Sequence, residues 1–277
     1  MTVEERSGLP SARRIVVKVG SSSISGDRTA QIEPLVDALA AARARGTEVV
    51  LVSSGAIATG LPFLDLSARP TDLATQQAAA AVGQNVLMNR YQRSLTRHGL
   101  VAGQILLTAG DLDDPSSRVN ALRALDRLLA LGILPIVNEN DTVATHEIRF
   151  GDNDRLASLV SVLLGADALV LLSDVDAIYT KPPTEPGATR ITAVAQGGSL
   201  AHVQFGGAGS AGVGTGGAGT KASAAMIASE AGSGVLITAT ELVGDALGGA
   251  DVGTWFEPAP RPAGRASMFT APGSAAE

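Results

Sequence analysis

One lysine, Lys18, lies within an apolar stretch near the start of the chain, in the sequence IVVKVG. A lysine in a buried strand is energetically costly unless its amine emerges at the strand end or meets an anion. Gly20 and three serines follow the stretch, and their backbone N–H groups and hydroxyls could surround a phosphate. The pattern favours an anion site. The alternative interpretation is a lysine that reaches solvent from an edge strand.

A second loop of small residues has the same character. Residues 53–56 (SSGA) follow another apolar run and include Ser54. They could form a similar nest of N–H groups, or an ordinary turn, since serine and glycine are common in both.

A glycine-rich stretch, residues 206–221, ends in Thr220 and Lys221 and opens a predicted helix. Residues 214–219 match G-x-G-x-x-G, but no convincing strand precedes them, which argues against a dinucleotide site. The order Thr-Lys is not that of a Walker A loop, which requires Gly-Lys followed by Ser or Thr. A lysine at the mouth of a helix suits a clamp for a terminal phosphate, and a flexible linker is the alternative.

The densest polar region holds two clusters, NENDT at residues 138–142 and GDNDR at residues 151–155. Asp141, Asp152 and Asp154 offer hard oxygen donors for Mg²⁺ or for a substrate ammonium group. A helix cap or a solvated loop would explain either cluster alone. Two such clusters close together favour a functional site.

Composition narrows the class of protein. The 277 residues are 45% hydrophobic and 17% charged, which suits one large globular domain or two small ones. Cysteine is absent, so disulfides and thiolate chemistry are excluded, and the three histidines have no metal-binding spacing. The net charge of −6 opposes general binding to nucleic acid or anionic lipid. With no membrane-spanning run or signal peptide in the sequence, we expect a soluble, cytoplasmic protein with a small-molecule partner.

The elements that would position these residues follow a regular order. Short runs rich in valine, isoleucine and leucine alternate with segments whose apolar residues recur every three or four positions, which is typical of βαβ units with a buried parallel sheet. Small and polar residues follow most of the runs, so they collect at the carboxyl ends of the strands, where open α/β sheets bind ligands. The predicted strands are residues 15–19, 48–52, 101–107, 133–137, 168–172 and 235–238. The predicted helices are residues 31–45, 72–97, 117–131, 153–164 and 220–231.

These motifs together resemble the glutamate 5-kinases of the amino-acid kinase superfamily. The resemblance spans about 240 residues in the family's order, and the run through residues 133–154 is its most diagnostic part. The matching segments are VVKVGSSS (16–23), VLVSSGAIATG (50–60), AAVGQ (80–84), GQILLT (103–108), ILPIVNENDTVATHEIRFGDND (133–154), LLSDVDAIYT (171–180) and GTGGAGTK (214–221).

The resemblance implies a three-layer α/β sandwich with a mainly parallel central sheet, and phosphorylation of the γ-carboxylate of L-glutamate by ATP with Mg²⁺. In this reading Lys18 and Lys221 stabilise the transferring phosphoryl group, and Asp154 orients both lysines. The glutamate-binding positions are Ser54, Asp141 and Asn153, with Asp141 suited to the α-ammonium. The nucleotide-binding positions are Lys18, Gly20, Ser173, Asp174, Thr215, Gly216, Gly217, Ala218, Gly219, Thr220 and Lys221. No residue is assigned as a metal ligand.

The resemblance also implies feedback inhibition by L-proline, functional coupling to glutamate-5-semialdehyde dehydrogenase and a homo-oligomer. Two alternatives stay open: a sibling kinase acting on another carboxylate, and a non-catalytic member that senses glutamate or proline. Many members carry a C-terminal PUA domain, and this chain ends before one could form. From composition, we expect residues 1–257 to form the catalytic domain and residues 258–277 a flexible tail.

Overall fold

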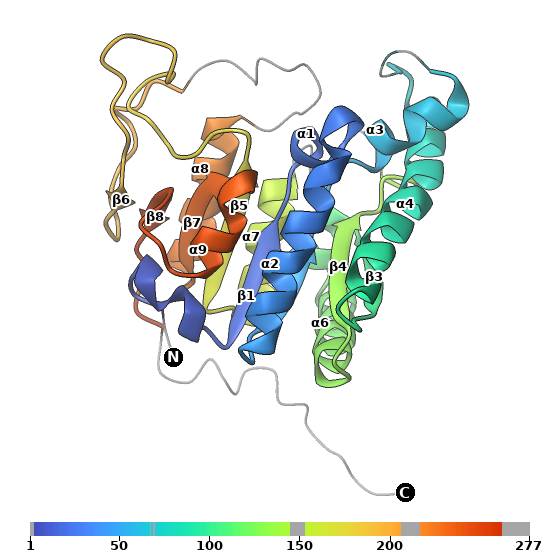
Figure 1. The fold of residues 1–277 in the computed structure, drawn as a ribbon, viewed down its shortest axis with the longest axis horizontal. Coiled ribbons are helices and arrows are strands. Elements are labelled where there is room, and N and C mark those ends of the chain that lie inside the picture. The colour runs from blue at the N-terminus through green and yellow to red at the C-terminus, as the bar shows by residue number, and fades with distance from the viewer. Residues whose placement is uncertain (1–2, 67, 69, 145–152, 206–216, 262–277) are drawn as a thin grey trace, which may run out of the picture.

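The computed structural model describes residues 3–66, 68, 70–144, 153–205 and 217–261. Its centre is an eight-stranded sheet in the order β3-β4-β2-β1-β5-β7-β8-β6 (Figure 1). All strand pairs are parallel except β7 with β8. The strands are β1 (Arg14–Lys18), β2 (Glu48–Val52), β3 (Ala102–Leu107), β4 (Leu134–Glu139), β5 (Ala168–Ser173), β6 (Ala193–Val194), β7 (Gly234–Ala239) and β8 (Thr254–Phe256).

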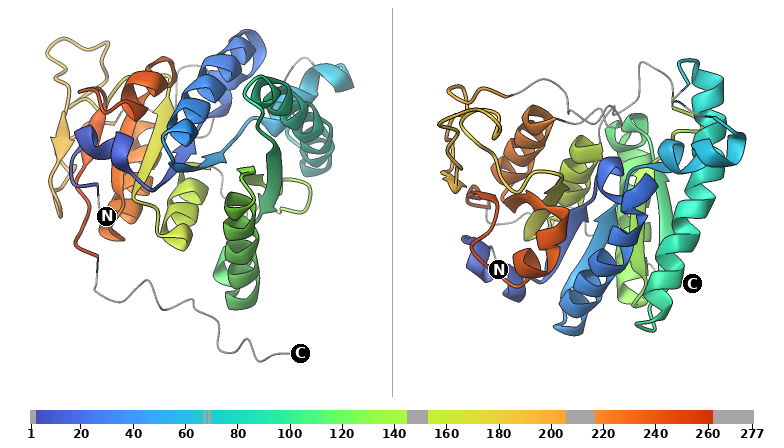
Figure 2. Two further views of the ribbon diagram at one scale, coloured as in Figure 1. Left: turned by 60° about the horizontal axis from the view of Figure 1, so that its bottom comes forward. Right: turned by 45° about the horizontal axis from the view of Figure 1, so that its top comes forward.

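Helices cover both faces of the sheet, which makes three layers (Figures 1 and 2). One face packs against α6, α7 and α8, and the other against α2, α4 and α9. The helices are α1 (Ser21–Ile24), α2 (Ile32–Ala44), α3 (Ala56–Gly60), α4 (Leu73–Thr96), α5 (Ala109–Asp113), α6 (Pro115–Ala130), α7 (Asn153–Leu164), α8 (Ala218–Glu230) and α9 (Val243–Leu247). Short 3-10 helices are η1 (Arg6–Ser11), η2 (Gly26–Gln31), η3 (Leu61–Leu64) and η4 (Thr240–Leu242).

The alternation of side chains along β1 explains the two cores. Val16 packs into the layer with α7 and α8, whereas Ile15 and Val17 pack into the layer with α2 and α4. Successive side chains of a strand point to opposite faces, so Lys18 lies on the same face as Val16. This face is the one that α7 and α8 cover.

The six predicted strands and five predicted long helices are present, with ends shifted by at most two residues. The predicted three-layer α/β sandwich is confirmed. β1 lies between β2 and β5, so Lys18 belongs to a central strand, and the edge-strand interpretation was wrong. β6 and β8, which have only two and three residues, were not predicted from the sequence.

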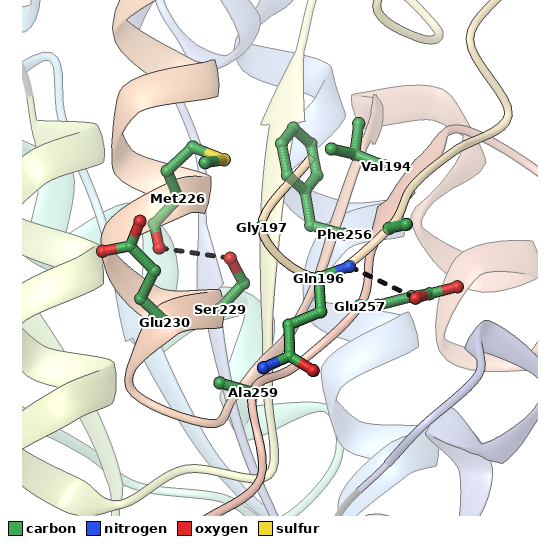
Figure 3. Close-up of a pocket in the computed structure, with 10 residues that line it drawn as sticks. Val194, Gln196, Gly197, Met226, Ser229, Glu230, Phe256, Glu257 and Ala259 are labelled. Carbon is green, nitrogen blue, oxygen red and sulfur yellow. Dashed lines mark hydrogen bonds between the residues drawn. The ribbon is translucent and has the colours of Figure 1, made fainter. Parts of the chain in front are cut away.

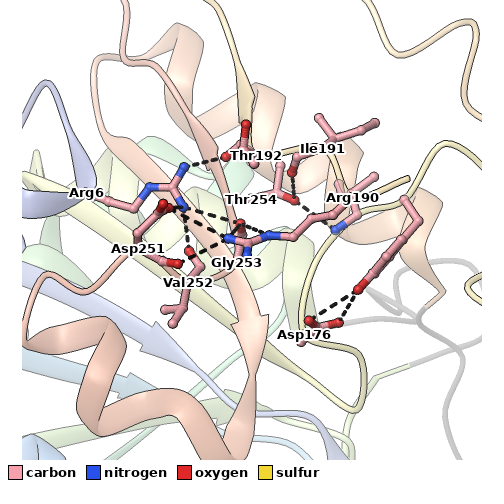
Figure 4. A network of polar contacts seen from close by, with 11 residues as sticks. Arg6, Asp176, Arg190, Ile191, Thr192, Asp251, Val252, Gly253 and Thr254 are labelled. Carbon is pink, nitrogen blue, oxygen red and sulfur yellow. Dashed lines mark hydrogen bonds and ion pairs between the residues drawn. The ribbon is translucent and has the colours of Figure 1, made fainter. Parts of the chain in front are cut away.

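β8 runs antiparallel beside β7 and joins the sheet to the N-terminal segment. The Trp255 indole N–H donates to the carbonyl of Glu4 at 3.0 Å. Arg6 donates to the carbonyls of Val252 and Thr192, and its guanidinium lies 2.7 Å from an oxygen of Asp251 (Figure 4). This network fastens η1 to the edge of the sheet.

The residues just after β8 contact the end of α8 and the loops that lead into β5 and β7. The backbone N–H of Ala259 donates to the carbonyl of Ser229 at 2.8 Å. Arg261 donates to the carbonyl of Gly232 and forms an ion pair, 3.3 Å long, with the fully buried Asp167. The domain boundary predicted after residue 257 stays a prediction, because residues 262–277 lie outside the described part. Residues up to Arg261 nevertheless pack on the domain.

Candidate active site

Two lysines meet one carboxylate at the carboxyl end of the central strands. Asp154, in the first turn of α7, pairs with Lys18 through Oδ1 and with Lys221 through Oδ2, the second contact being 3.0 Å. All three side chains are buried, and Asp154 is fully so. Three predicted catalytic residues from β1, α7 and α8 are thus in direct contact.

The charge of this cluster indicates what it can bind. Among these three buried side chains two ammonium groups face one carboxylate, and an anion would favourably complement the second ammonium. The chain has only three lysines beside eighteen arginines, and two of the three are here. A compact ammonium suits a point contact with a phosphate oxygen.

Glycines leave room next to this cluster. A Cβ on Gly20, which precedes α1, would lie 3.8 Å from the Nζ of Lys18. Gly55, which precedes α3, has a φ of 91°, a left-handed conformation that favours glycine, and a Cβ there would lie 3.3 Å from the Cβ of Ser21. The loops after β1 and β2 therefore lie against each other.

Apart from Lys18 and Gly20, the described residues predicted to bind the nucleotide lie on the β5 and β7 side of the cluster, at the end of β5 and the start of α8. The Ser173 hydroxyl, at the end of β5, donates to the carboxylate of Asp174 at 3.2 Å. Gly217 precedes α8, and the Thr220 hydroxyl donates to its carbonyl at 2.9 Å. Ala218 and Gly219 form the first turn of α8. Thr215 and Gly216 lie outside the described residues.

The residues predicted to bind the amino-acid substrate lie on the β2 and β4 side of the cluster. Asn153, the first residue of α7, donates through Nδ2 to the carbonyl of Ser53 at 2.6 Å and to Oδ1 of Asn138 at 2.7 Å. Ser54 follows Ser53 in the loop after β2, and Asp141 lies in the turn after β4. The backbone N–H of Ser53 donates to Val137, so the ends of β2 and β4 are joined.

Sequence reasoning missed three buried polar residues of this half. Asn138 Nδ2 donates to Oε1 of Gln84 at 2.7 Å, and the hydroxyls of Ser53 and Tyr91 are 2.9 Å apart. Burial raises the pKa of Tyr91, so its hydroxyl stays protonated at neutral pH. Gln84 and Tyr91 belong to α4, and although Gln84 ends the matching segment AAVGQ, the sequence assigned no role to either residue. Asn138 belongs to the polar cluster of residues 138–142, which the sequence indicated, but its contacts with Gln84 and Asn153 were not predicted.

A cavity of about 230 Å³ lies elsewhere, between β6, β8 and the second half of α8 (Figure 3). Val194, Met226 and Phe256 line it, with Glu230 and Glu257 also on its wall. Phe256 pairs with Val235 near the amino end of β7, whereas Lys18 ends β1. This cavity is therefore at the other end of the strands from the lysine cluster, and no predicted site residue lines it.

Comparisons with known proteins agree with this architecture. A model of the amino acid kinase family matches residues 13–239. Carbamate kinase from Giardia lamblia bound to AMP-PNP shares the fold, with a TM-score of 0.65 and 16% identity over 90% of this chain and all of the other. Isopentenyl phosphate kinase from T. acidophilum has a TM-score of 0.61, also at 16% identity, over 88% of this chain and all of the other. The chain belongs to the amino acid kinase family.

More similar relatives narrow this class. A glutamate 5-kinase of Clavibacter sepedonicus is 69% identical over 258 residues, which cover 93% of this chain and 99% of the relative. One of Leifsonia xyli subsp. xyli is 68% identical over 94% of this chain and 96% of the relative. One of Streptomyces avermitilis is 56% identical, and 69% of its own length is covered. Within the amino acid kinases, the chain is a member of the glutamate 5-kinases, and the predicted resemblance is confirmed.

Proposed function

We propose that this protein transfers the γ-phosphoryl group of ATP to the γ-carboxylate of L-glutamate, the first step of proline biosynthesis, with Lys18, Lys221 and Asp154 as its catalytic residues. Family membership supports the reaction, and the contact among these three side chains carries the assignment of residues. The alternative substrates are disfavoured because the very similar relatives are named for glutamate.

The chemistry requires positive charge and alignment more than proton transfer. An oxygen of the γ-carboxylate forms a bond to the γ-phosphorus while the bond from that phosphorus to the β,γ-bridging oxygen breaks, and ADP leaves. The attacking carboxylate is already ionised at neutral pH, so no general base is needed. Two anions approach each other, and the ammonium groups of Lys18 and Lys221 reduce their repulsion.

Asp154 keeps the two ammonium groups in place before the substrates arrive. Without it, two like charges would be buried near each other, which is unfavourable. Its carboxylate therefore acts by position and needs no proton exchange. We assign ATP to the side formed by Ser173, Asp174 and the start of α8, and glutamate to the side formed by Ser54, Asp141 and Asn153.

The proposed reaction also uses Mg²⁺, bound to the phosphates of the nucleotide. Within residues 3–66, 68, 70–144, 153–205 and 217–261, no group of three or more histidine, aspartate or glutamate side chains could hold a metal ion. The described residues thus do not fit a dedicated magnesium cage. Mg²⁺ commonly binds proteins through substrate phosphates and water, so we propose that it arrives with ATP.

We also propose a cytoplasmic homo-oligomer that L-proline inhibits near the glutamate side and that works with glutamate-5-semialdehyde dehydrogenase. An acyl phosphate hydrolyses in water, so prompt use by a second enzyme suits the product. In the described part of the chain, no helix is long and apolar enough to cross a membrane.

The experiment that tests the function is an ATP and Mg²⁺ assay with hydroxylamine, which traps an acyl phosphate as a hydroxamate. Glutamate, aspartate, N-acetylglutamate and buffer are compared. We expect hydroxamate with glutamate and little with the other three. A preference for another carboxylate would indicate a sibling kinase, and ligand binding without product would indicate a sensor.

A further inference from the structure

Three amide side chains form a continuous hydrogen-bonded chain that starts on α4 and ends at the amino-acid side of the site. Oε1 of Gln84 accepts from Nδ2 of Asn138 at 2.7 Å. Oδ1 of Asn138 in turn accepts from Nδ2 of Asn153 at 2.7 Å. Each of the three residues is at least nine-tenths buried.

Contacts with backbone groups fix which side-chain atoms are donors and which are acceptors in this series of hydrogen bonds. The backbone N–H of Glu139 donates to Oδ1 of Asn138 at 2.9 Å, which identifies that atom as the acceptor. The carbonyl of Ser53 accepts from Asn153 at 2.6 Å, which identifies Nδ2 of Asn153 as the donor. Asn138 must then turn its own NH₂ toward Gln84, where an acceptor is required.

The consequence for Asn153 is that both of its amide hydrogens are in use. One goes to the carbonyl of Ser53 and the other to Asn138. The carboxamide is left with Oδ1, an acceptor only. An acceptor at this place suits the α-ammonium of an amino acid and not a carboxylate.

Gln84 is poorly explained by stability alone. Its Nε2 is buried without a hydrogen-bond partner, and an unsatisfied buried donor destabilises the fold. This cost is generally larger than the stability gained from one neutral hydrogen bond such as the one to Asn138. An apolar side chain of the same length would avoid the cost, so the useful property of Gln84 is the acceptor that it gives to Asn138.

The backbone of α4 is held closely at this point. Gly83, next to Gln84, faces α3, and a Cβ there would overlap the carbonyl oxygen of Ala56. Gly60 of α3 approaches Ala79 of α4 in the same way. Two glycines therefore let the backbones of the two helices approach closely. This contact fixes the position of Gln84 relative to the loop after β2.

We propose that Gln84 is a positioning residue that acts through Asn138 to hold Asn153 with its oxygen available to the α-ammonium of the substrate. The inference rests on the proposed function, because it names the substrate group that Asn153 recognises. It predicts that Gln84 sets the preference for substrates that carry this ammonium group.

The test compares glutamate with glutarate, which is the same dicarboxylate without the α-amino group. Gln84→Met removes the acceptor and the orphaned donor together. We expect it to raise KM for glutamate by about three- to tenfold, the effect of one lost hydrogen bond, and to leave KM for ATP unchanged. Binding of glutarate, measured as a substrate or a competitive inhibitor, should be unchanged, so the preference for glutamate falls by the same factor.

Gln92→Met is the matched control in the same helix. Gln92 accepts from the backbone of Ala102 at 2.9 Å and donates to Leu100 at 3.1 Å, at the far end of α4. Its loss should lower the melting temperature and leave the preference for glutamate over glutarate unchanged. Asn138→Ala should reduce the preference, and adding Gln84→Met to it should cause no further loss.

Equal weakening of glutamate and glutarate by Gln84→Met would overturn the inference, as would additive effects of Gln84→Met and Asn138→Ala. Should Gln84→Met fail to fold, Gln84→Glu supplies a second test, because it keeps an acceptor for Asn138 and should keep the preference. Loss of the preference in that variant would also overturn the inference. A wild-type protein that makes no hydroxamate from glutamate would instead refute the proposed function itself.

Discussion

The two halves of the candidate site are built from different chemistry. The half that carries the lysines uses full charges: two ammonium groups flank the buried carboxylate of Asp154. The half around Asn153 combines the carboxylate of Asp141 with neutral amides and hydroxyls connected to α4. Charge stabilises a phosphoryl group whose own charge moves during the reaction, whereas neutral amides hold their direction and select a substrate by geometry.

The difference predicts separate kinetic effects for the two halves. Loss of a lysine should act mainly on turnover, because the interaction strengthens in the transition state. Loss of a polar group on the amino-acid side should act mainly on substrate binding. A variant of either half that changed both properties equally would break the distinction.

The largest effect is expected for Lys221→Ala. It removes one of the two ammonium groups, and kcat should fall about a hundredfold or more, with a smaller change in KM for glutamate. Steady-state kinetics of the purified variant measure both constants. Lys181→Ala, at the third lysine of the chain, is the control and should keep normal turnover. Near-normal turnover of Lys221→Ala would remove this residue from the site.

Asp141→Ala should weaken glutamate binding by about ten- to hundredfold, the range for one hydrogen bond with a charged group. ATP binding should change little, because Asp141 lies in the turn after β4 on the amino-acid side. Calorimetric titration with each ligand distinguishes the two effects, and the exposed Asp245→Ala is the control. Equal loss of both ligands would assign Asp141 a structural role.

Tyr91→Phe should have a smaller effect. It removes the hydroxyl that lies 2.9 Å from Ser53, a buried contact worth about 0.5–1.5 kcal/mol. We expect a lower melting temperature and at most a few-fold rise in KM for glutamate, with kcat unchanged. Thermal denaturation and kinetics test this. A large loss of kcat would show that α4 supports the charged half too.

The smallest effect concerns the start of α4, where Asp72 accepts from the backbone N–H of Thr75 at 2.8 Å. Hydrogen bonds from Thr75 lower the pKa of Asp72 below its ordinary value of 3.8. A lowered folded-state pKa adds stability at pH values above the ordinary pKa of the group. This stability is lost as the pH falls through the folded-state pKa.

Asp72→Asn keeps a good N-cap that cannot titrate. Its melting temperature should match the wild type at pH 7 and fall slightly less between pH 5 and pH 3. Melting curves across this range measure the difference. An identical fall in melting temperature between pH 5 and pH 3 in both proteins would show that the cap contributes nothing to this pH dependence.

The charged half was visible in the sequence because both of its lysines violate a local rule. Lys18 interrupts an apolar strand, and Lys221 ends a glycine-rich segment. Such residues are expected only where function compensates their cost. The central strands were equally clear, since a strand buried on both faces reads as a continuous apolar run.

The buried amide and hydroxyl groups that support the amino-acid half could not be predicted in the same way. Gln84 lies in a helix where glutamine is an ordinary residue, and its partner Asn138 is 54 positions away. Only the three-dimensional register of α4 against β4 brings them together. The short strands β6 and β8 were missed for a related reason, because two or three residues show no periodicity.

The attachment of η1 to the last strand also bears on how the chain folds during synthesis. Arg6 and its acceptor Val252 are 246 positions apart (Figure 4), and the Trp255 indole donates to the carbonyl of Glu4. A ribosome that adds roughly 5–20 residues per second needs on the order of 10–50 seconds to cover that distance. During this time Leu9 can already pack with residues of β1 and α2, but the contacts of Glu4 and Arg6 with the last strand cannot form. A nascent chain that stops short of β8 therefore lacks the contacts that fasten η1 to the end of the sheet.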